Sequence, residues 1–377
     1  MDFDLTEAQK IMKQAAHDFL SRECPKRLVR QLEENEEGYS RDLWRKLAEL
    51  GWMGLIVPEG YGGSGGSFLD LAVLLEEMGY AICPGPFFSS VVLGGLPILM
   101  AGNEAQKQEF LPALAEGRKI FTLALHEPDG GYDPSCIKSH AVLNTNECIV
   151  RGVKLFVADA LLADYILCVA RTREDGYPEK GITIFIIDAR CPGITRTPLR
   201  TLSWDKQCEV VFDDVKVSPN SILGEIHRGW TILQDILEKA ALCKGAEMLG
   251  GAQAVMDMTL AYARDRVQFD HPIGSFQAIQ HYCADMWIDI SASRMLLYKA
   301  ACEADQGTNV TKSVAMAKAR IGDAYRRVTA LGHQIFGGIG FTMEHDMHLY
   351  HRRSISGDLM FGSAEVQREK VALELGL

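Results

Sequence analysis

A block of short, β-prone segments lies between two long helical regions, and this order limits the folds that the chain can adopt. The segments are Ile120–Leu125, Cys148–Val153, Tyr165–Ala170 and Ile182–Ile187. Turn-forming residues separate them, as is typical of the strands of an antiparallel sheet. Because strands and helices do not alternate along the chain, the pattern argues against a βαβ nucleotide-binding fold.

The helical regions on either side complete a chain of the α+β class with three sequential domains. We expect an N-terminal helical domain over residues 1–118, a middle antiparallel β domain over 119–225 and a C-terminal helical domain over 226–377. Four long helical segments in the last domain predict an up-and-down four-helix bundle. These segments are approximately Gly229–Arg266, Phe276–Gln306, Asn309–Phe336 and Asp346–Leu375.

Capping residues and apolar spacing predict helices in the N-terminal domain. Thr6 precedes an amphipathic stretch and is a suitable N-cap. A second helical pattern runs from Asp42 to Leu50 and is followed by Gly51, a plausible C-cap. The pattern resumes over Phe68–Met78.

The charge balance and the lack of long apolar runs argue against several classes of protein. The net charge is −11, whereas a protein that binds nucleic acid needs a concentrated basic face. No run of 18 apolar residues predicts a transmembrane helix, and the N-terminus lacks the apolar core of a secretion signal. The ten cysteines show no CxxC or zinc-module spacing, so we interpret them as reduced thiols of a cytoplasmic protein.

Four short motifs follow one another along nearly the whole chain. Two lie in the middle domain, LHEPDGGYD at Leu125–Asp133 and GVKLFV at Gly152–Val157. Two lie in the C-terminal domain, RDRVQFDHPIGSFQ at Arg264–Gln277 and QIFGGIG at Gln334–Gly340. In this order and at these separations, they resemble the motifs of the acyl-CoA dehydrogenase family.

The resemblance implies an FAD-dependent enzyme that removes hydrogen from the α and β carbons of an acyl-CoA thioester. Electrons would leave through an electron-transferring flavoprotein. In the family, the glycine-rich fourth motif reaches the FAD of a neighbouring subunit, which implies a dimer or, more commonly, a tetramer.

The motifs of the C-terminal domain provide the expected contacts to the cofactor. A forked guanidinium suits the FAD pyrophosphate, so we assign that role to Arg266. Phe269 could lie against the flavin or the adenine. Glycines allow the backbone to approach a ligand closely. The predicted FAD contacts of this domain are Arg266, Gln268, Phe269, Gln277, Gln334, Gly337 and Gly338.

The loop of the middle domain is expected beside the isoalloxazine ring. Where family members place a threonine that bonds to the flavin, this chain has His126, which can donate a hydrogen bond. The alternative is a structural histidine. Phe156 stands where a tryptophan often packs on the flavin edge, and Tyr132 replaces a serine near the thioester arm of CoA. Leu125, Gly131 and Ala158 complete the predicted FAD contacts of this domain.

The catalytic base of the family is missing from both of its usual positions. The family Glu of a C-terminal Y-E-G-T segment corresponds to Phe361, and the position used by some relatives on the first bundle helix corresponds to Ala240. Neither side chain can accept a proton. The same turn provides two predicted substrate contacts, Phe361 and Gly362, and two predicted FAD contacts, Ser363 and Glu365.

A replacement base is available on the first bundle helix. Glu247 lies seven residues after Ala240, on nearly the same helix face and about 10 Å along the axis. The stripe is otherwise small or apolar, and a carboxylate on such a stripe must be paired or functional. The alternative role for Glu247 is an ion pair with Lys244 or with a residue of a partner helix. Asp285 and Glu365 are weaker candidates.

This departure resembles a branch of the family that acts on bulky, cyclic or dicarboxylic thioesters. The branch also contains subunits that work only beside a second, different acyl-CoA dehydrogenase chain. We therefore keep two alternatives to desaturation of a bulky, cyclic or branched acyl-CoA. One is reduction of an enoyl-CoA or elimination of a β-substituent, and the other is a non-catalytic subunit that completes a partner's FAD site.

Three histidines at helical spacing could hold a metal ion. His345, His348 and His351 lie three residues apart, but no carboxylate or cysteine completes a known ligand set. We interpret them as a polar surface near the FAD and expect no metal site.

Overall fold

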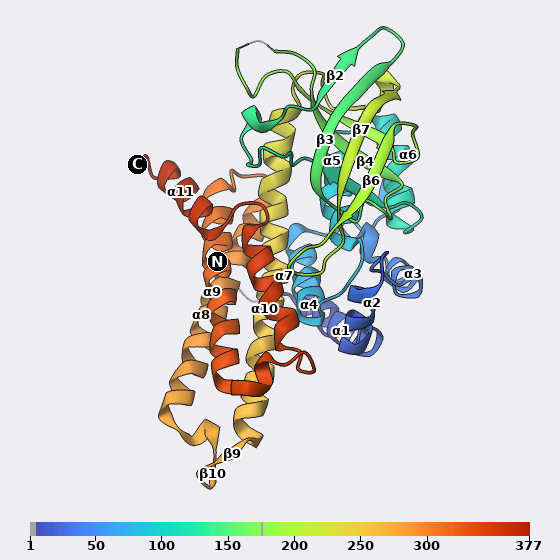
Figure 1. Cartoon of the computed structure of the whole chain (residues 1–377). Helices are drawn as coiled ribbons and strands as arrows, with labels where there is room; N and C mark the ends of the chain where they lie inside the picture. Colours follow the sequence, from blue (N-terminus) through green and yellow to red (C-terminus); the bar gives the residue numbers. More distant parts are fainter. Residues whose placement is uncertain (1–4, 175) are drawn as a thin grey trace. The chain divides into compact units, whose positions relative to one another are not determined.

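The computed structural model describes residues 5–174 and 176–377, which form two compact units (Figure 1). The first, which we call the bundle unit, combines the N-terminal residues up to Arg30 with Ser67–Cys83 and Glu238–Leu377. The second, the sheet unit, combines Gln31–Gly66 with Pro84–Leu237.

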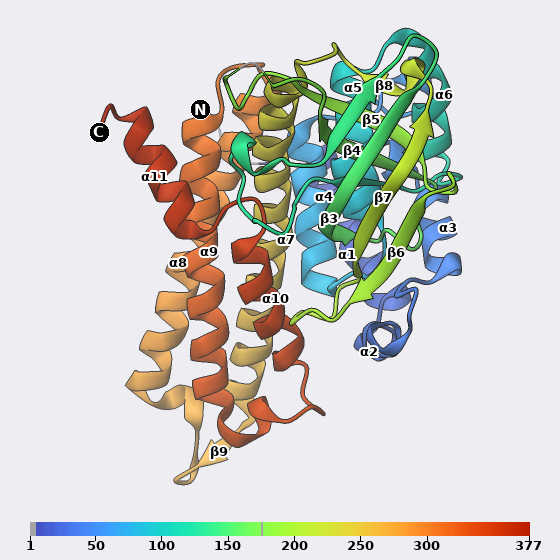
Figure 2. The same ribbon diagram turned by 45° about the horizontal axis from the view of Figure 1, so that its top comes forward.

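The bundle unit is built on long helices that lie alongside one another (Figures 1 and 2). Helices α8, α10 and α11 pack on α9, while α1 packs on α4 and α4 packs on α8. The helices are α1 (Glu7–Glu23), α4 (Phe68–Ala81), α7 (Gly229–Asp265), α8 (Gln277–Asp305), α9 (Thr311–Phe336), α10 (Met347–Leu359) and α11 (Ala364–Glu374). The first turns of α7 belong to the sheet unit.

Glycine allows the backbones of α4 and α7 to touch. A Cβ atom on Gly79 would lie 1.9 Å from the carbonyl oxygen of Glu247. A Cβ atom on Gly250 would lie 1.7 Å from the carbonyl oxygen of Glu76. Any larger residue at either position would push the two helices apart.

The expectation of one continuous helix over Asp346–Leu375 is wrong, because the chain turns between α10 and α11. Phe361 has φ 59° and Gly362 has φ 94°, both outside the helical region. The side chain of Ser363 then caps α11 by accepting a hydrogen bond from the amide of Val366. The bundle therefore ends in two short helices separated by a sharp turn.

Within its described residues, the sheet unit contains eight strands, and all four strands predicted from the sequence are present. They are β1 (Phe121–Ala124), β2 (His140–Leu143), β3 (Cys148–Ala158), β4 (Tyr165–Arg171), β5 (Ile182–Asp188), β6 (Ile194–Leu199), β7 (Gln207–Val217) and β8 (Ile222–Leu223). The strand order is β6-β7-β3-β2-β4-β5-β8, and β1 pairs with β4. Pairing is antiparallel except where β1 and β2 meet β4.

Short helices complete the sheet unit and the connections between elements. The α-helices are α3 (Arg41–Glu49), α5 (Leu96–Ala101) and α6 (Glu104–Ala115), and α2 (Lys26–Glu34) leads from the bundle unit into this one. Segment η3 (Phe88–Gly95) is a π-helix. The 3-10 turns of this unit are η1 (Trp52–Gly54), η2 (Glu59–Tyr61), η4 (Pro134–Cys136) and η5 (Pro219–Ser221).

The helix signals read in the N-terminal region are confirmed. Thr6 forms a capping box with Gln9 at the start of α1. Gly51, with φ 74°, follows the end of α3. Helix α4 starts at Phe68 as predicted and is capped by Ser67. Among the described residues, no helix has both the length and the apolar character needed to cross a membrane.

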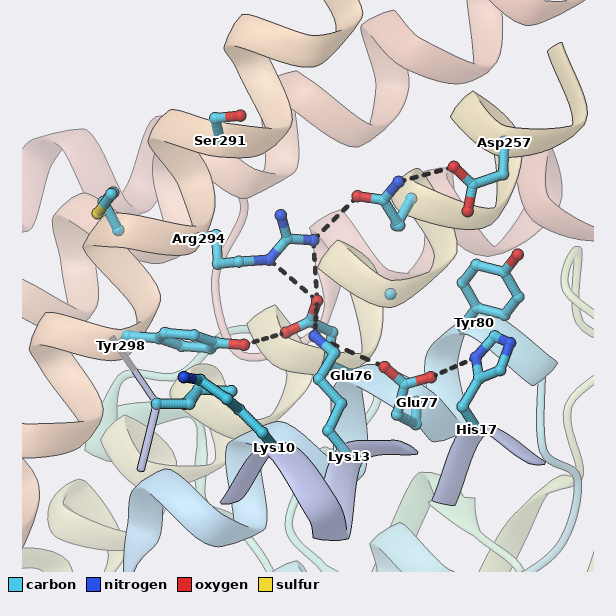
Figure 3. Close-up of a pocket in the computed structure, with 14 residues that line it drawn as sticks. Lys10, Lys13, His17, Glu76, Glu77, Tyr80, Asp257, Ser291, Arg294 and Tyr298 are labelled. Atoms are coloured by element: carbon cyan, nitrogen blue, oxygen red, sulfur yellow. Dashed lines mark hydrogen bonds and ion pairs between the residues drawn. The ribbon is translucent and has the colours of Figure 1, made fainter. Parts of the chain in front are cut away.

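A network of buried charges joins α1, α4, α7 and α8 (Figure 3). Glu76, 2% exposed, accepts hydrogen bonds from Lys13 at 2.9 Å, from Arg294 at 2.9 and 3.0 Å and from the Tyr298 hydroxyl at 2.7 Å. Burial would raise the pKa of Glu76, but Arg294 and Lys13 hold it below its usual value. The neighbouring Glu77 pairs with His17 at 2.9 Å, and burial raises its pKa.

We predict that the change Glu76→Gln destabilises the bundle unit, because Arg294 and Lys13 would keep their charges in a buried site without a carboxylate. The cost of breaking a buried pair is about 3–5 kcal/mol. Urea-induced unfolding followed by circular dichroism measures it. The exposed ion pair of Glu49 with Arg45 provides the control, since Glu49→Gln should have a much smaller effect. Equal stabilities of the two variants would contradict the prediction.

Candidate functional site

Two of the sequence motifs are joined inside the sheet unit by a buried ion pair. Glu127 belongs to the loop that follows β1, and Lys154 lies on β3. The Lys154 ammonium donates to the Glu127 carboxylate at 2.6 Å, and their side chains are 0% and 4% exposed. Lys154 also donates to the carbonyl of Leu125, the buried residue just after β1, at 3.2 Å.

The carboxylate of Glu127 has further donors. The backbone amides of Lys138 and Ser139 bond to it at 2.8 and 3.0 Å. Burial would raise the pKa of Glu127, but Lys154 and these donors hold it below its usual value. Gly152 keeps this arrangement possible, because a Cβ atom there would lie 2.1 Å from the Ser139 hydroxyl oxygen. The glutamate thus ties its own loop to two other segments, residues 138–139 and β3.

The anchored loop carries His126. Its ring lies edge-on to the ring of Tyr132, with centroids 4.7 Å apart. Burial lowers the pKa of His126, and a hydrogen bond to the backbone of Gly131 partly opposes this shift. A neutral imidazole has one N–H. With this N–H donated to Gly131, the second ring nitrogen is left as an acceptor, and the contact of His126 with the flavin stays a prediction.

Phe156 lies beside this loop on a distorted part of β3. The register of β3 against β7 shifts between Lys154 and Val157, which marks a bulge. Phe156 has φ 55° and is 56% exposed. The amide of Leu155 donates to the carbonyl of His126 at 2.8 Å, so the bulge and the loop are tied together. An exposed aromatic side chain on a strained backbone is the kind of feature found at binding sites.

The remaining predicted cofactor residues of this unit are less suited to side-chain contacts. Gly131, with φ 87°, is exposed at the tip of the loop. The carbonyl of Ala158 already accepts a hydrogen bond from the Thr122 hydroxyl at 2.6 Å. Leu125 is buried behind the loop.

A cationic depression that sequence reasoning missed lies on the same unit. It has a volume of about 550 Å³, and its lining includes Lys138, His140, Arg171 and Arg173. The Arg171 guanidinium donates to the carbonyls of Ile137, Pro134 and Pro178. These hydrogen bonds hold the Arg171 side chain in place in the lining of the depression. Its members are scattered in the sequence, so no local motif indicated it.

In the bundle unit, the predicted FAD residues of the third motif lie at the end of α7. A small hairpin of β9 (Val267–Gln268) and β10 (His271–Pro272) follows the helix and leads through η6 (Ile273–Ser275) into α8. Arg266, Gln268 and Gln277 are exposed, and Phe269 is 84% exposed. The hairpin extends from the end of the bundle in Figure 1.

The glycine-rich motif meets the same end of the bundle. The rings of Tyr262 on α7 and Phe336 on α9 are 4.5 Å apart, so the two helix ends are neighbours. Exposed Gln334 lies in the last turn of α9, and η7 (Gly337–Phe341) follows. No atom of the residues that the structure describes lies within 4 Å of a Cβ atom built on Gly337 or Gly338. This backbone is therefore open to a ligand.

The turn between α10 and α11 is held by a fully buried lysine of α9. Lys318, 1% exposed, donates to the carbonyls of Gly357, Asp358 and Gly362 at 3.0, 2.9 and 3.2 Å. Burial lowers its pKa to about 8. Lys318 shares an apolar face with Val314 and Ile321, which was the one signal in the sequence for a buried lysine.

The predicted contacts on this turn are fixed in different ways. Phe361 is 9% exposed, and its carbonyl accepts a hydrogen bond from Gln367 at 2.7 Å. A Cβ atom on Gly362 would lie 2.8 Å from the side-chain nitrogen of Gln367 that donates this hydrogen bond. Ser363 caps α11, and Glu365 is exposed in its first turn.

The structure separates the predicted FAD residues of the bundle into two groups. Lys318 bonds to the turn that carries Gly362, whereas Gly337 follows the last residue of the same 26-residue helix. At 1.5 Å per residue, about 28 Å of helix lies between them. The hairpin and η7 form one group, and the turn between α10 and α11 forms the other.

Glu247 lies in the middle of α7 on the predicted stripe. Ile236, Ala240, Cys243 and Ala254 are all buried, while the side chain of Glu247 is 24% exposed. It forms an ion pair with Lys244, the alternative role foreseen from the sequence. Burial and then the Glu247 charge raise the pKa of Cys243 to about 12. Asp285, the weaker candidate on α8, is paired with Arg327 at 2.8 Å.

The three histidines contact different partners. His345 packs on Phe336 with ring centroids 4.3 Å apart, and His348 bonds to Arg30 at 3.1 Å. His351 bonds to the Thr329 hydroxyl at 3.2 Å. In the part of the chain that the structure describes, no three His, Cys, Asp or Glu side chains gather as metal ligands would.

Comparison with known proteins finds matches along the whole chain. Three sequence profiles match in order, described as acyl-CoA dehydrogenase, N-terminal domain (residues 6–118), middle domain (122–215) and C-terminal domain (227–376).

Individual relatives match over nearly their full length. A short-chain-specific acyl-CoA dehydrogenase of Megasphaera elsdenii is 34% identical over 97% of each chain. An NADH-dependent acryloyl-CoA reductase of Anaerotignum propionicum is 30% identical over 100% of this chain and 96% of its own. The solved structure of butyryl-CoA dehydrogenase from Megasphaera elsdenii is 33% identical, covers 100% of both chains and has a TM-score of 0.93.

We predict that Glu127→Gln destabilises the sheet unit by about 3 kcal/mol at neutral pH, because Lys154 would remain buried without its counter-charge. The folded pKa of Glu127 is lowered, so its stabilising effect is present above the unfolded pKa, about 4.3, and is lost as the pH falls below it. Thermal unfolding of both proteins between pH 7 and pH 4 should show the difference shrinking with acidification. A difference that is constant with pH would contradict this.

We predict a dependence of the same sign, but at higher pH, for Lys318, because its folded pKa of about 8 lies below the unfolded value of about 10.4. Between these values the unfolded chain binds more protons, so the native state gains stability as the pH rises. The free energy of unfolding of the wild type, compared with that of Lys318→Met, should increase by on the order of 3 kcal/mol between pH 7 and pH 10. Denaturant unfolding of the pair of proteins measures this, and an unchanged difference would refute it.

Proposed function

The chain belongs to the acyl-CoA dehydrogenase family of FAD-dependent oxidoreductases, and on this premise we propose that it desaturates a bulky, cyclic or branched acyl-CoA between its α and β carbons. The observation that carries the proposal is the platform of His126, Tyr132 and Phe156 in the sheet unit, held by the buried pair of Glu127 and Lys154. Its aromatic surface and free imidazole acceptor suit a flat, hydrogen-bonding ring.

The residues present fit an FAD molecule. The platform would meet the isoalloxazine ring, with His126 accepting a hydrogen bond and Phe156 lying against an edge. At the end of the bundle, exposed Arg266 would meet the pyrophosphate beside the open backbone of Gly337 and Gly338. Bound FAD supplies a hydride acceptor for the β-hydrogen of the substrate.

Two subunits would share each cofactor. The 28 Å of helix between the turn that carries Ser363 and the glycine motif supports an arrangement in which these groups serve different FAD molecules. We therefore propose a homodimer or homotetramer. The branch resemblance leaves a hetero-oligomer with a second acyl-CoA dehydrogenase chain as the alternative.

The cationic depression of the sheet unit is our candidate for the phosphates of CoA. Lys138 and His140 are exposed there, and Arg171 is fixed by backbone carbonyls. A local cluster of cations overcomes the acidic net charge of the chain at short range, because salt screens charges beyond about 8–10 Å.

For the proton transfer we propose Glu247. It is the carboxylate on an otherwise buried, uncharged stripe of α7, and its ion pair with Lys244 would orient it. Phe361 then fills the position of the usual base with an apolar side chain, which suits a substrate whose bulk displaces the reacting carbons.

We place the reaction in the cytoplasm, with an electron-transferring flavoprotein as the electron acceptor. The ten cysteines, all free thiols in the structure, support a reducing compartment.

A second candidate is the reverse reaction, reduction of an enoyl-CoA. It is favoured by the similarity to an acryloyl-CoA reductase and by the absence of a carboxylate at Phe361. In that direction Glu247 would return a proton to the α carbon. Mass spectrometry of the products formed from saturated and unsaturated thioesters separates the two directions, and it would also detect elimination of a β-substituent.

We predict that a panel of branched and cyclic acyl-CoAs bleaches the flavin absorbance and that Glu247→Gln slows this by at least about 100-fold, the usual contribution of a general base. The matched control is Asp235→Asn, an exposed carboxylate earlier on α7, which should leave the rate unchanged. Stopped-flow absorbance measures both.

The outcomes are distinct. Loss of reduction with FAD retained identifies Glu247 as the base, whereas unchanged kinetics eliminate it. If no thioester of either kind changes the flavin spectrum of the wild type, the chain is not an active dehydrogenase or reductase. Copurification with a second acyl-CoA dehydrogenase chain would then indicate a non-catalytic subunit.

A further inference from the structure

We propose that Cys24 and Cys83 are an oxidation site, at which hydrogen peroxide converts two neighbouring thiols into a disulfide. Both residues belong to the bundle unit, although they are far apart in sequence. Neither has a role in the proposed desaturation.

The ends of two helices bring the cysteines together. Cys24 directly follows α1, and its amide bonds to the carbonyl of Leu20 at 2.9 Å. Cys83 follows α4, and its amide bonds to the carbonyl of Met78 at 2.9 Å. The two thiols are hydrogen-bonded to each other. Each sulfur is therefore fixed next to its partner by the helix that precedes it.

The surroundings favour one thiolate in the pair. Lys26 lies beside Cys24 and donates to the carbonyls of Tyr80 and Ala81 at 3.2 and 2.7 Å. The hydrogen bond from Cys83, followed by the charges of Lys26 and Arg353, outweighs burial and lowers the pKa of Cys24. The same hydrogen bond and burial raise the pKa of Cys83. A thiolate that accepts a proton from a neighbouring thiol is the starting arrangement for oxidation.

Exposure differs between the two residues and suits a small oxidant. Cys24 is 2% exposed, whereas Cys83 is partly exposed. A peroxide molecule reaches the pair from the side of Cys83, and the shared proton can move between the sulfurs before reaction.

The chemistry balances with one peroxide for each pair. A thiolate sulfur attacks a peroxide oxygen, so that an S–O bond forms, the O–O bond breaks and the leaving hydroxide takes up a proton to become water. The second sulfur then attacks the sulfenic acid sulfur. An S–S bond forms, the S–O bond breaks, and the second water leaves. Two thiols are oxidised by two electrons, and both peroxide oxygens are reduced to water.

The test uses the purified flavoprotein. The protein is first reduced, and the reductant is removed. The concentration of hydrogen peroxide is then raised in steps until Cys302, a partly exposed cysteine of α8, is oxidised. Free thiols are alkylated, and the digest is analysed by mass spectrometry. We expect a peptide with Cys24 joined to one with Cys83, two hydrogens lighter than the separate peptides, at peroxide concentrations below those that oxidise Cys302. Dithiothreitol should restore both thiols.

Variants control for the pairing. Cys302→Ser should leave the linked peptide unchanged, while Cys83→Ser should abolish it and leave Cys24 to be alkylated or overoxidised alone. Recovery of Cys24 and Cys83 from the wild type as separate peptides, alkylated or individually oxidised, would overturn the proposal. Because the wild type provides this result, the conclusion does not depend on the folding of a variant.

Discussion

The buried pair of Lys154 and Glu127 is the interaction on which the candidate site depends. It lies under the loop that carries His126 and under the bulge that carries Phe156. Two full charges with almost no exposure are stable only when every donor and acceptor is satisfied, and Glu127 receives backbone amides in addition to Lys154. The geometry of the platform is therefore set by a few strong interactions beneath it.

In the bundle unit, the buried charge of Lys318 likewise holds a turn of the chain in place, the turn between α10 and α11. Lys318 bonds to two carbonyls at the end of α10 and to one in the turn that follows, and so allows the chain to turn where one long helix would otherwise continue. This turn displaces the predicted contacts at Phe361 and Ser363 from those at Gly337. The proposed sharing of FAD between subunits follows from that distance.

Much of the fold could be predicted because its signals are local. Thr6, the helical pattern over Phe68–Met78 and the four β-prone segments act within a few residues, and the structure agrees with each. The break at Phe361 could not be predicted, because the residue that stabilises it lies on another helix. The partner of Glu127 and the thiol pair are likewise tertiary contacts between distant segments. The role of Glu247 remains a proposal, since its ion pair with Lys244 fits both roles foreseen for it.

Flavin content tests the central claim most directly, namely that the platform and the open bundle end of adjoining subunits hold FAD. The purified protein should be yellow, and denaturation should release FAD in an amount equimolar with the chain. Protein stripped of flavin should take up added FAD to the same ratio. Colourless protein that takes up no added FAD would contradict the account, and the proposed base and substrate would fall with it.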